Sequence, residues 1–137
     1  MHANGMSIFA ALLATAGAML MDGHGRAAVA QDARLEGSWS GGGSIEFASG
    51  DRERARCRAS FSPQSTRTYR MYAVCATPSA RVEQTASLRR VSPDSFAGQF
   101  YNQEYNVSRS IRITVQGNKL QAALRGEAGS ANLSLTR

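Results

Sequence analysis

Four arginines occupy alternate positions in one short stretch of the chain: Arg52, Arg54, Arg56 and Arg58. Alternate residues of a β-strand face the same side, so this spacing predicts a row of guanidinium groups along one strand face. Guanidinium groups bind carboxylates and phosphates through paired hydrogen bonds. The competing interpretation is a solvated strand face whose arginines pair with Glu46 and Glu83 and discourage pairing at a sheet edge.

The two cysteines of the chain lie on opposite arms of a predicted β-hairpin. Residues 52–61 and 68–75 both alternate with a period of two, and Ser62-Pro63 begins the connection between them. A turn centred near Thr66 places Cys57 directly opposite Cys75. Opposed Cα atoms lie about 4.5 to 5.5 Å apart, within the range of a disulfide. We therefore expect a structural bridge rather than a redox pair or half of a metal site, because the sequence has no C-x-x-C motif.

Chemistry that depends on histidine is absent from most of the chain. His2 and His24 are the only histidines, and both precede residue 31. Without a histidine or a free thiol, residues 31–137 lack the usual general base and the usual nucleophile pairs. The carboxylates show no recognisable catalytic spacing. We expect no catalytic residue, no metal site and no cofactor.

The N-terminus has the pattern of a cleavable secretory signal. Residues 6–21 form an apolar and small-residue run, a polar stretch follows, and Ala28-Val29-Ala30 supplies an A-x-A cleavage site. The alternative is an uncleaved membrane anchor, although the run is shorter than the roughly 20 apolar residues of a spanning helix. We expect a signal at 1–30, a single domain at 31–137, and a periplasmic or secreted location.

The predicted domain is basic. The net charge is +6, and it is unchanged by removal of residues 1–30, which contain one Arg and one Asp. A basic exported domain favours an anionic envelope component or an acidic protein as partner, and its charge is compatible with peripheral membrane contact. The competing explanation is that the net charge only keeps the domain soluble. We expect no nucleic-acid partner, because aromatic residues do not interleave with the arginines.

Hydrophobic alternation divides the predicted domain into eight strands separated by short turns. The pattern indicates an all-β, eight-stranded antiparallel up-and-down meander that closes into a small barrel, with a β-sandwich as the alternative. A membrane barrel is excluded because lipid would face arginines. Arg109 falls on the apolar face of its strand, where it marks a bulge, a rim position or a buried charge with a function. The expected strands are 35–47, 52–61, 68–75, 81–91, 96–100, 105–116, 119–125 and 130–136.

Residues 35–39 (LEGSW) resemble the G-x-W opening of the first strand in calycin-like barrels, the lipocalin-like and avidin-like proteins. Together with a cysteine in each arm of the second hairpin, G-x-F-Y-N at 98–102 and I-x-V-x-G-N at 113–118, the chain resembles a group of small exported bacterial proteins. The resemblance implies an exported barrel whose Trp39 plugs one end. It implies no ligand and no activity.

Two functional hypotheses follow. The first is a non-catalytic exported binding module, an inhibitor or envelope-associated protein, that recognises an anionic partner through the Arg-rich strand and Arg70. The alternative is a carrier that holds a small apolar ligand inside the barrel, unless the aromatic residues simply fill the core. The residues expected near the mouth of such a carrier are Trp39, Tyr69, Phe100 and Tyr105.

Overall fold

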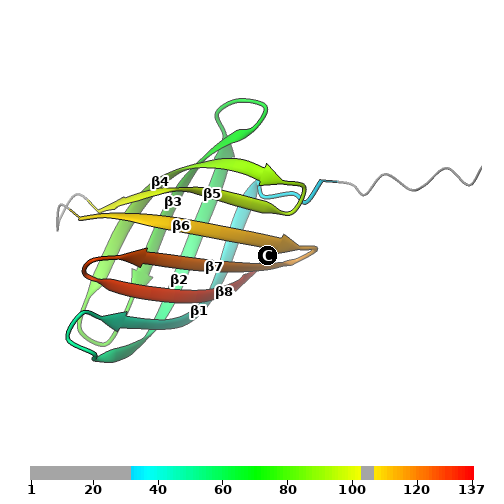
Figure 1. The fold of residues 1–137 in the computed structure, drawn as a ribbon. Coiled ribbons are helices and arrows are strands. Elements are labelled where there is room, and N and C mark those ends of the chain that lie inside the picture. The colour runs from blue at the N-terminus through cyan, green and yellow to red at the C-terminus, as the bar shows by residue number, and fades with distance from the viewer. Residues whose placement is uncertain (1–31, 103–106) are drawn as a thin grey trace, which may run out of the picture.

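A computed structural model describes residues 32–102 and 107–137, which form a closed barrel of eight antiparallel strands (Figure 1). Each strand pairs with its neighbour in sequence, and β1 pairs with β8 to complete the circle. The predicted barrel is therefore confirmed over the sandwich alternative. The predicted signal at 1–30 and Tyr105 lie outside the described residues. The strands are β1 (Gly37–Phe47), β2 (Arg52–Pro63), β3 (Thr68–Ala76), β4 (Arg81–Ser92), β5 (Ser95–Asn102), β6 (Val107–Gln116), β7 (Lys119–Gly126) and β8 (Gly129–Thr136).

The β2–β3 hairpin has the predicted register. Cys57 lies opposite Cys75 and Phe61 lies opposite Met71. The two cysteines form a disulfide, with their Cα atoms 4.1 Å apart. Because side chains alternate between faces, this register directs both cysteines into the barrel and the neighbouring arginines out of it.

The interior is filled by the apolar residues of all eight strands. Trp39, Phe96, Phe100 and Leu88 are among the largest fully buried side chains. An internal cavity of about 20 Å³ lies among these side chains and is lined by apolar residues apart from Gln84. That volume is close to the space occupied by a single water molecule. An eight-stranded barrel is just wide enough for side chains to fill it, and this one is almost completely packed.

Two glycines allow neighbouring strands to approach closely. A Cβ atom at Gly43 in β1 would lie 1.9 Å from the carbonyl oxygen of Asn132 in β8, and one at Gly98 in β5 would lie 1.9 Å from that of Ser87 in β4. Backbone atoms occupy these positions, so no other side chain fits without a shift of the sheet. The glycines of these strands therefore permit the strong coiling that closure of a small barrel requires.

One end of the barrel is closed by aromatic rings and arginines. Trp39 is buried, and its Nε1 donates a hydrogen bond of 2.9 Å to the carbonyl oxygen of Leu35. The Arg137 guanidinium lies 4.4 Å from the centre of the Trp39 ring. At the same end, Arg90 lies 4.6 Å from the Phe96 ring centre and donates to the Ala33 carbonyl at 2.8 Å. The expected plugging role of Trp39 agrees with this arrangement.

No helix in the described parts of the chain is long and apolar enough to cross a membrane.

Candidate anion-binding hollow

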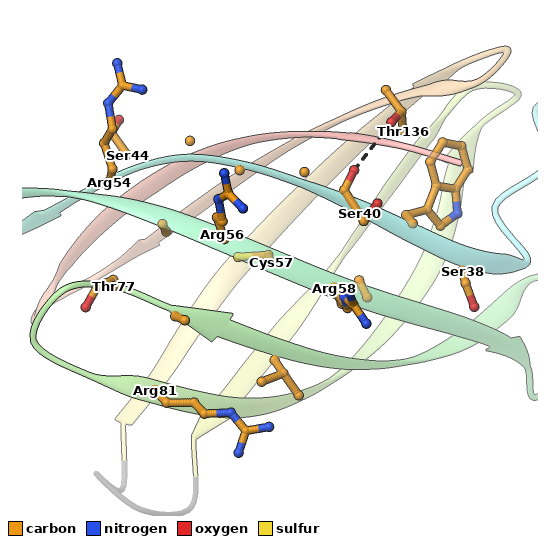
Figure 2. A pocket seen from close by; sticks show the side chains of 18 of the residues that line it. Ser38, Ser40, Ser44, Arg54, Arg56, Cys57, Arg58, Thr77, Arg81 and Thr136 are labelled. Carbon is orange, nitrogen blue, oxygen red and sulfur yellow. Dashed lines mark hydrogen bonds between the residues drawn. The ribbon is translucent and has the colours of Figure 1, made fainter.

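A broad hollow of about 1880 Å³ runs over the outer surface of β1, β2 and β3 and reaches the start of β4 and the C-terminus (Figure 2). Five arginines line it, and its lining contains no Asp or Glu. Such a surface attracts anions because no carboxylate among the lining residues competes for the guanidinium groups. The arginines are Arg54, Arg56, Arg58, Arg81 and Arg137.

The row formed by Arg54, Arg56 and Arg58, hereafter the Arg row, projects from the outward face of β2. All three residues are exposed. Their neighbours on the adjacent strands are short, because β1 places Ser44, Gly42 and Ser40 opposite them. On the other side, β3 places Ala76 beside Arg56 and Val74 beside Arg58. Short neighbours leave the guanidinium groups open to solvent and form the floor of the hollow.

The fourth predicted arginine is already paired. Arg52 Nη2 lies 3.0 Å from Glu46 Oε2, and both side chains are largely exposed. Across residues 32–102 and 107–137 this is the one ion pair between acidic and basic side chains. The predicted neutralisation of the strand face by Glu46 and Glu83 therefore holds for Arg52 and does not extend to the Arg row.

Two further arginines complete the hollow, and sequence reasoning missed both. Arg81 opens β4 opposite Ala76, which in turn lies opposite Arg56. The Thr77–Ala80 turn sets this register, so extension of the hairpin pairing by one strand would have found Arg81. Arg137 instead follows β8 and reaches the hollow through closure of the barrel. Its guanidinium donates to the carbonyl oxygens of Glu36 and Gly117 at 3.2 and 3.4 Å.

The other residues singled out from the sequence lie elsewhere. Arg70 is exposed opposite Ser62 and does not line the hollow. Tyr69 is buried, and its hydroxyl accepts a hydrogen bond of 3.2 Å from Arg90. Phe100 is buried toward the other end of the barrel, opposite Arg109. The internal cavity is not lined by Trp39, Tyr69 or Phe100.

Arg109 faces inward at the end of the barrel opposite Trp39. Its Nε is buried and has no hydrogen-bond partner among the described residues, and its aliphatic chain packs where a Cβ on Gly126 would lie, 2.4 Å from its Cγ. Burial lowers the pKa of the guanidinium because desolvation disfavours the charged form. Of the three options that the sequence left for this residue, the rim position fits best, because Arg109 pairs with Phe100 without a shift in register and is only half-buried.

The described residues offer little to covalent or metal chemistry. Both cysteines are in the disulfide. Within 32–102 and 107–137, no group of three or more His, Cys, Asp or Glu side chains is placed to hold a metal ion. What the hollow can do chemically is bind anions reversibly through charge-assisted hydrogen bonds.

Comparison with known proteins relates the fold, and only the fold, to other molecules. No protein-family model matches the chain, and no curated protein matches it. The solved structures that resemble it include a redesigned β-barrel, mFAP1, bound to DFHBI, with 14% sequence identity and a TM-score of 0.64 over 75% of this chain and 94% of that one. The chain thus forms a small eight-stranded barrel similar to designed, lipocalin-like barrels.

Two more solved structures give the same result. A de novo designed fluorescence-activating β-barrel is 11% identical with a TM-score of 0.58, over 75% of this chain and 93% of that one. EF1p2_mFAP2b bound to DFHBI is 16% identical with a TM-score of 0.60, over the same fractions of the two chains. At these identities the likeness is one of backbone architecture.

Proposed function

We propose that the protein is a non-catalytic exported binding module that recognises an anionic envelope component or an acidic protein through the hollow on β1–β3. The observation that carries this proposal is the lining of the hollow, which has five arginines and no carboxylate. A row of like charges on one strand repels itself. An anion that bridges the guanidinium groups relieves this repulsion and forms paired hydrogen bonds with them.

The charge of the whole domain would assist the same interaction. A net charge of +6 attracts anionic partners over a distance of about 8 to 10 Å at physiological ionic strength. That attraction is not specific to one wall of the barrel. Specificity in this proposal comes from the local geometry of the Arg row, so the test must separate the row from net charge.

A pair of matched charge reversals makes that separation. The site variant is Arg54→Glu with Arg58→Glu, and the control is Arg112→Glu with Arg125→Glu, two exposed residues on β6 and β7. Both variants change the net charge by the same amount. Retention is measured on phosphatidylglycerol vesicles, a polyaspartate matrix and a sulfated polysaccharide matrix at about 150 mM salt.

We expect the site variant to lose at least tenfold in affinity for whichever matrix binds the wild type, while the control loses less than threefold. Melting curves should be nearly unchanged in both variants, because all four positions are solvent-exposed. Equal losses in the two variants would show that net charge alone drives retention. Failure of the wild type to bind any of the three matrices would also contradict the proposal.

The carrier alternative has less support. The internal cavity of about 20 Å³ has room for about one water molecule and not for an organic ligand. The aromatic residues expected at its mouth are either core residues or, for Tyr105, outside the described part of the chain. The interior is therefore better explained as a packed core than as a binding site.

A further inference from the structure

The Arg row has a regular spacing that constrains its partner. Arg54, Arg56 and Arg58 occupy successive outward positions of β2. A strand rises about 3.3 to 3.4 Å per residue, so side chains on one face recur about every 6.7 Å. Arg52 does not extend the row, because its guanidinium is held 3.0 Å from Glu46. The Arg row, which forms no ion pair with a described residue, therefore presents three guanidinium groups in line.

Closure of the barrel determines how a partner can approach. Every strand is hydrogen-bonded on both sides, and β1 with β8 removes the last edge. A partner chain therefore cannot add a strand to the sheet, which is the usual route for recognition of extended peptides. It must instead lie on the outer face of the barrel, where side chains bind it.

We propose that the hollow binds an extended acidic segment of another protein, in which Asp or Glu recurs at every second residue. This inference rests on the proposed function and names its partner class. In an extended chain, alternate side chains recur with the same spacing of about 6.7 Å as the Arg row. Three successive carboxylates would each face one guanidinium, with Gly42 and Ala76 leaving room beside the central Arg56.

The other walls of the hollow suit the same partner. Tyr72 is 45% exposed and lies with Val74 on the β3 side, where it can contact the aliphatic part of an intervening side chain. Arg81 stands one strand further on, on the same side as Ala76. It can receive an additional carboxylate next to the central pair.

Two other anionic classes fit less well. Binding of single-stranded nucleic acid uses several aromatic rings to stack bases, and the hollow offers one exposed aromatic side chain, Tyr72, among its lining residues. An anionic bilayer presents a broad surface, whereas the unpaired arginines lie in line within a hollow. The linear arrangement favours a linear partner.

Two synthetic peptides of equal length and charge test the spacing. One repeats Asp-Ser and the other repeats Asp-Asp-Ser-Ser, so only the first places all carboxylates on one face of an extended chain. Binding to the full-length protein is measured by fluorescence anisotropy at about 150 mM salt. We expect the alternating peptide to bind about tenfold more tightly than the blocked peptide.

Three variants test whether the Arg row causes the preference for the alternating peptide. Arg56→Gln removes the central guanidinium and should reduce the preference to less than threefold, while Arg112→Gln on β6 leaves it unchanged. Glu46→Gln releases Arg52 and should extend the row to four, which tightens binding of a longer alternating peptide several-fold. No change with Glu46→Gln would contradict the role of spacing.

The outcomes separate this inference from the proposed function. Equal binding of the two peptides would overturn the inference that the carboxylates of the partner match the spacing of the Arg row. The proposed recognition of anions would stand. Retention on vesicles or sulfated polysaccharide with no binding of either peptide would overturn the acidic-protein partner and leave the broader proposal intact. No binding to any anionic probe would overturn both.

Discussion

At the scale of single residues, Arg109 places a charged side chain at a position where the alternation of the strand predicts an apolar one. It occupies an apolar position of β6, between the buried Ile111 and the rim. Its Nε is buried with no acceptor in the part of the chain that the structure describes, and a buried donor that loses its water partner costs about 1 to 3 kcal/mol. The lowered pKa of the guanidinium has the same origin in desolvation. A guanidinium stays protonated in proteins, so this cost does not change with pH over the physiological range.

Substitution Arg109→Met should therefore stabilise the protein. Met preserves the unbranched chain that packs against Gly126 and removes the buried Nε donor. We expect the free energy of unfolding to rise by about 1 kcal/mol, measured by urea denaturation. The matched control Arg125→Met, at an exposed position of β7, should change stability by less than about 0.5 kcal/mol. A destabilised Arg109→Met variant would show that Arg109 has a favourable partner.

At the scale of elements, β2 performs two separate tasks on its two faces. Ala55, Cys57, Ala59 and Phe61 are buried, whereas the arginines between them are exposed. The disulfide joins β2 to β3 from inside the barrel. Since the bridge and the Arg row share a strand and point in opposite directions, one can be altered with little effect on the other.

Removal of the bridge should lower stability and leave recognition intact. The cysteines are 18 residues apart in sequence, a separation for which the chain-entropy model gives about 3 kcal/mol. We expect Cys57→Ala with Cys75→Ala to lower the free energy of unfolding by roughly that amount in denaturant titrations. Below its melting temperature, the variant should retain wild-type affinity for anionic probes. An unchanged denaturation midpoint would refute the first expectation, and a large loss of affinity would refute the second.

At the scale of the whole molecule, closure of the barrel has two consequences. It eliminates strand edges, which removes a common route to aggregation and to peptide capture. It also brings β8 beside β1, and so places Arg137 against Trp39 and at the border of the hollow. In Figure 1 the C-terminus lies next to the turn between β6 and β7, consistent with the hydrogen bond from the Arg137 amide to the Asn118 carbonyl oxygen.

A packed interior predicts that the purified protein carries no internal ligand. Its internal cavity of about 20 Å³ can hold about one water molecule. Native mass spectrometry of protein purified from its own compartment should therefore give the mass of the polypeptide alone. The control is the same sample after organic extraction, which should have an identical mass. A retained organic mass that disappears on extraction would support the carrier alternative.

Much of the fold followed from the sequence because its determinants are local. Alternation specified the strands, and turn chemistry together with the two cysteines specified the β2–β3 register, in which Cys57 lies opposite Cys75. The arginines on β2 were also predictable, because a period of two places them on the face opposite the core. Arg109 was recognisable as an exception to the same alternation.

The candidate site, in contrast, depended on contacts between segments distant in sequence. Alternation could not show that Arg52 would be paired with Glu46 while Arg54, Arg56 and Arg58 stayed free, because pairing depends on the neighbours across each strand. The location of Arg137 depended on the closing pair of strands. The sequence by itself determined the period and the charge of each face. Only the tertiary structure decided which charges share a surface, because cross-strand register and barrel closure set distances that no local pattern contains.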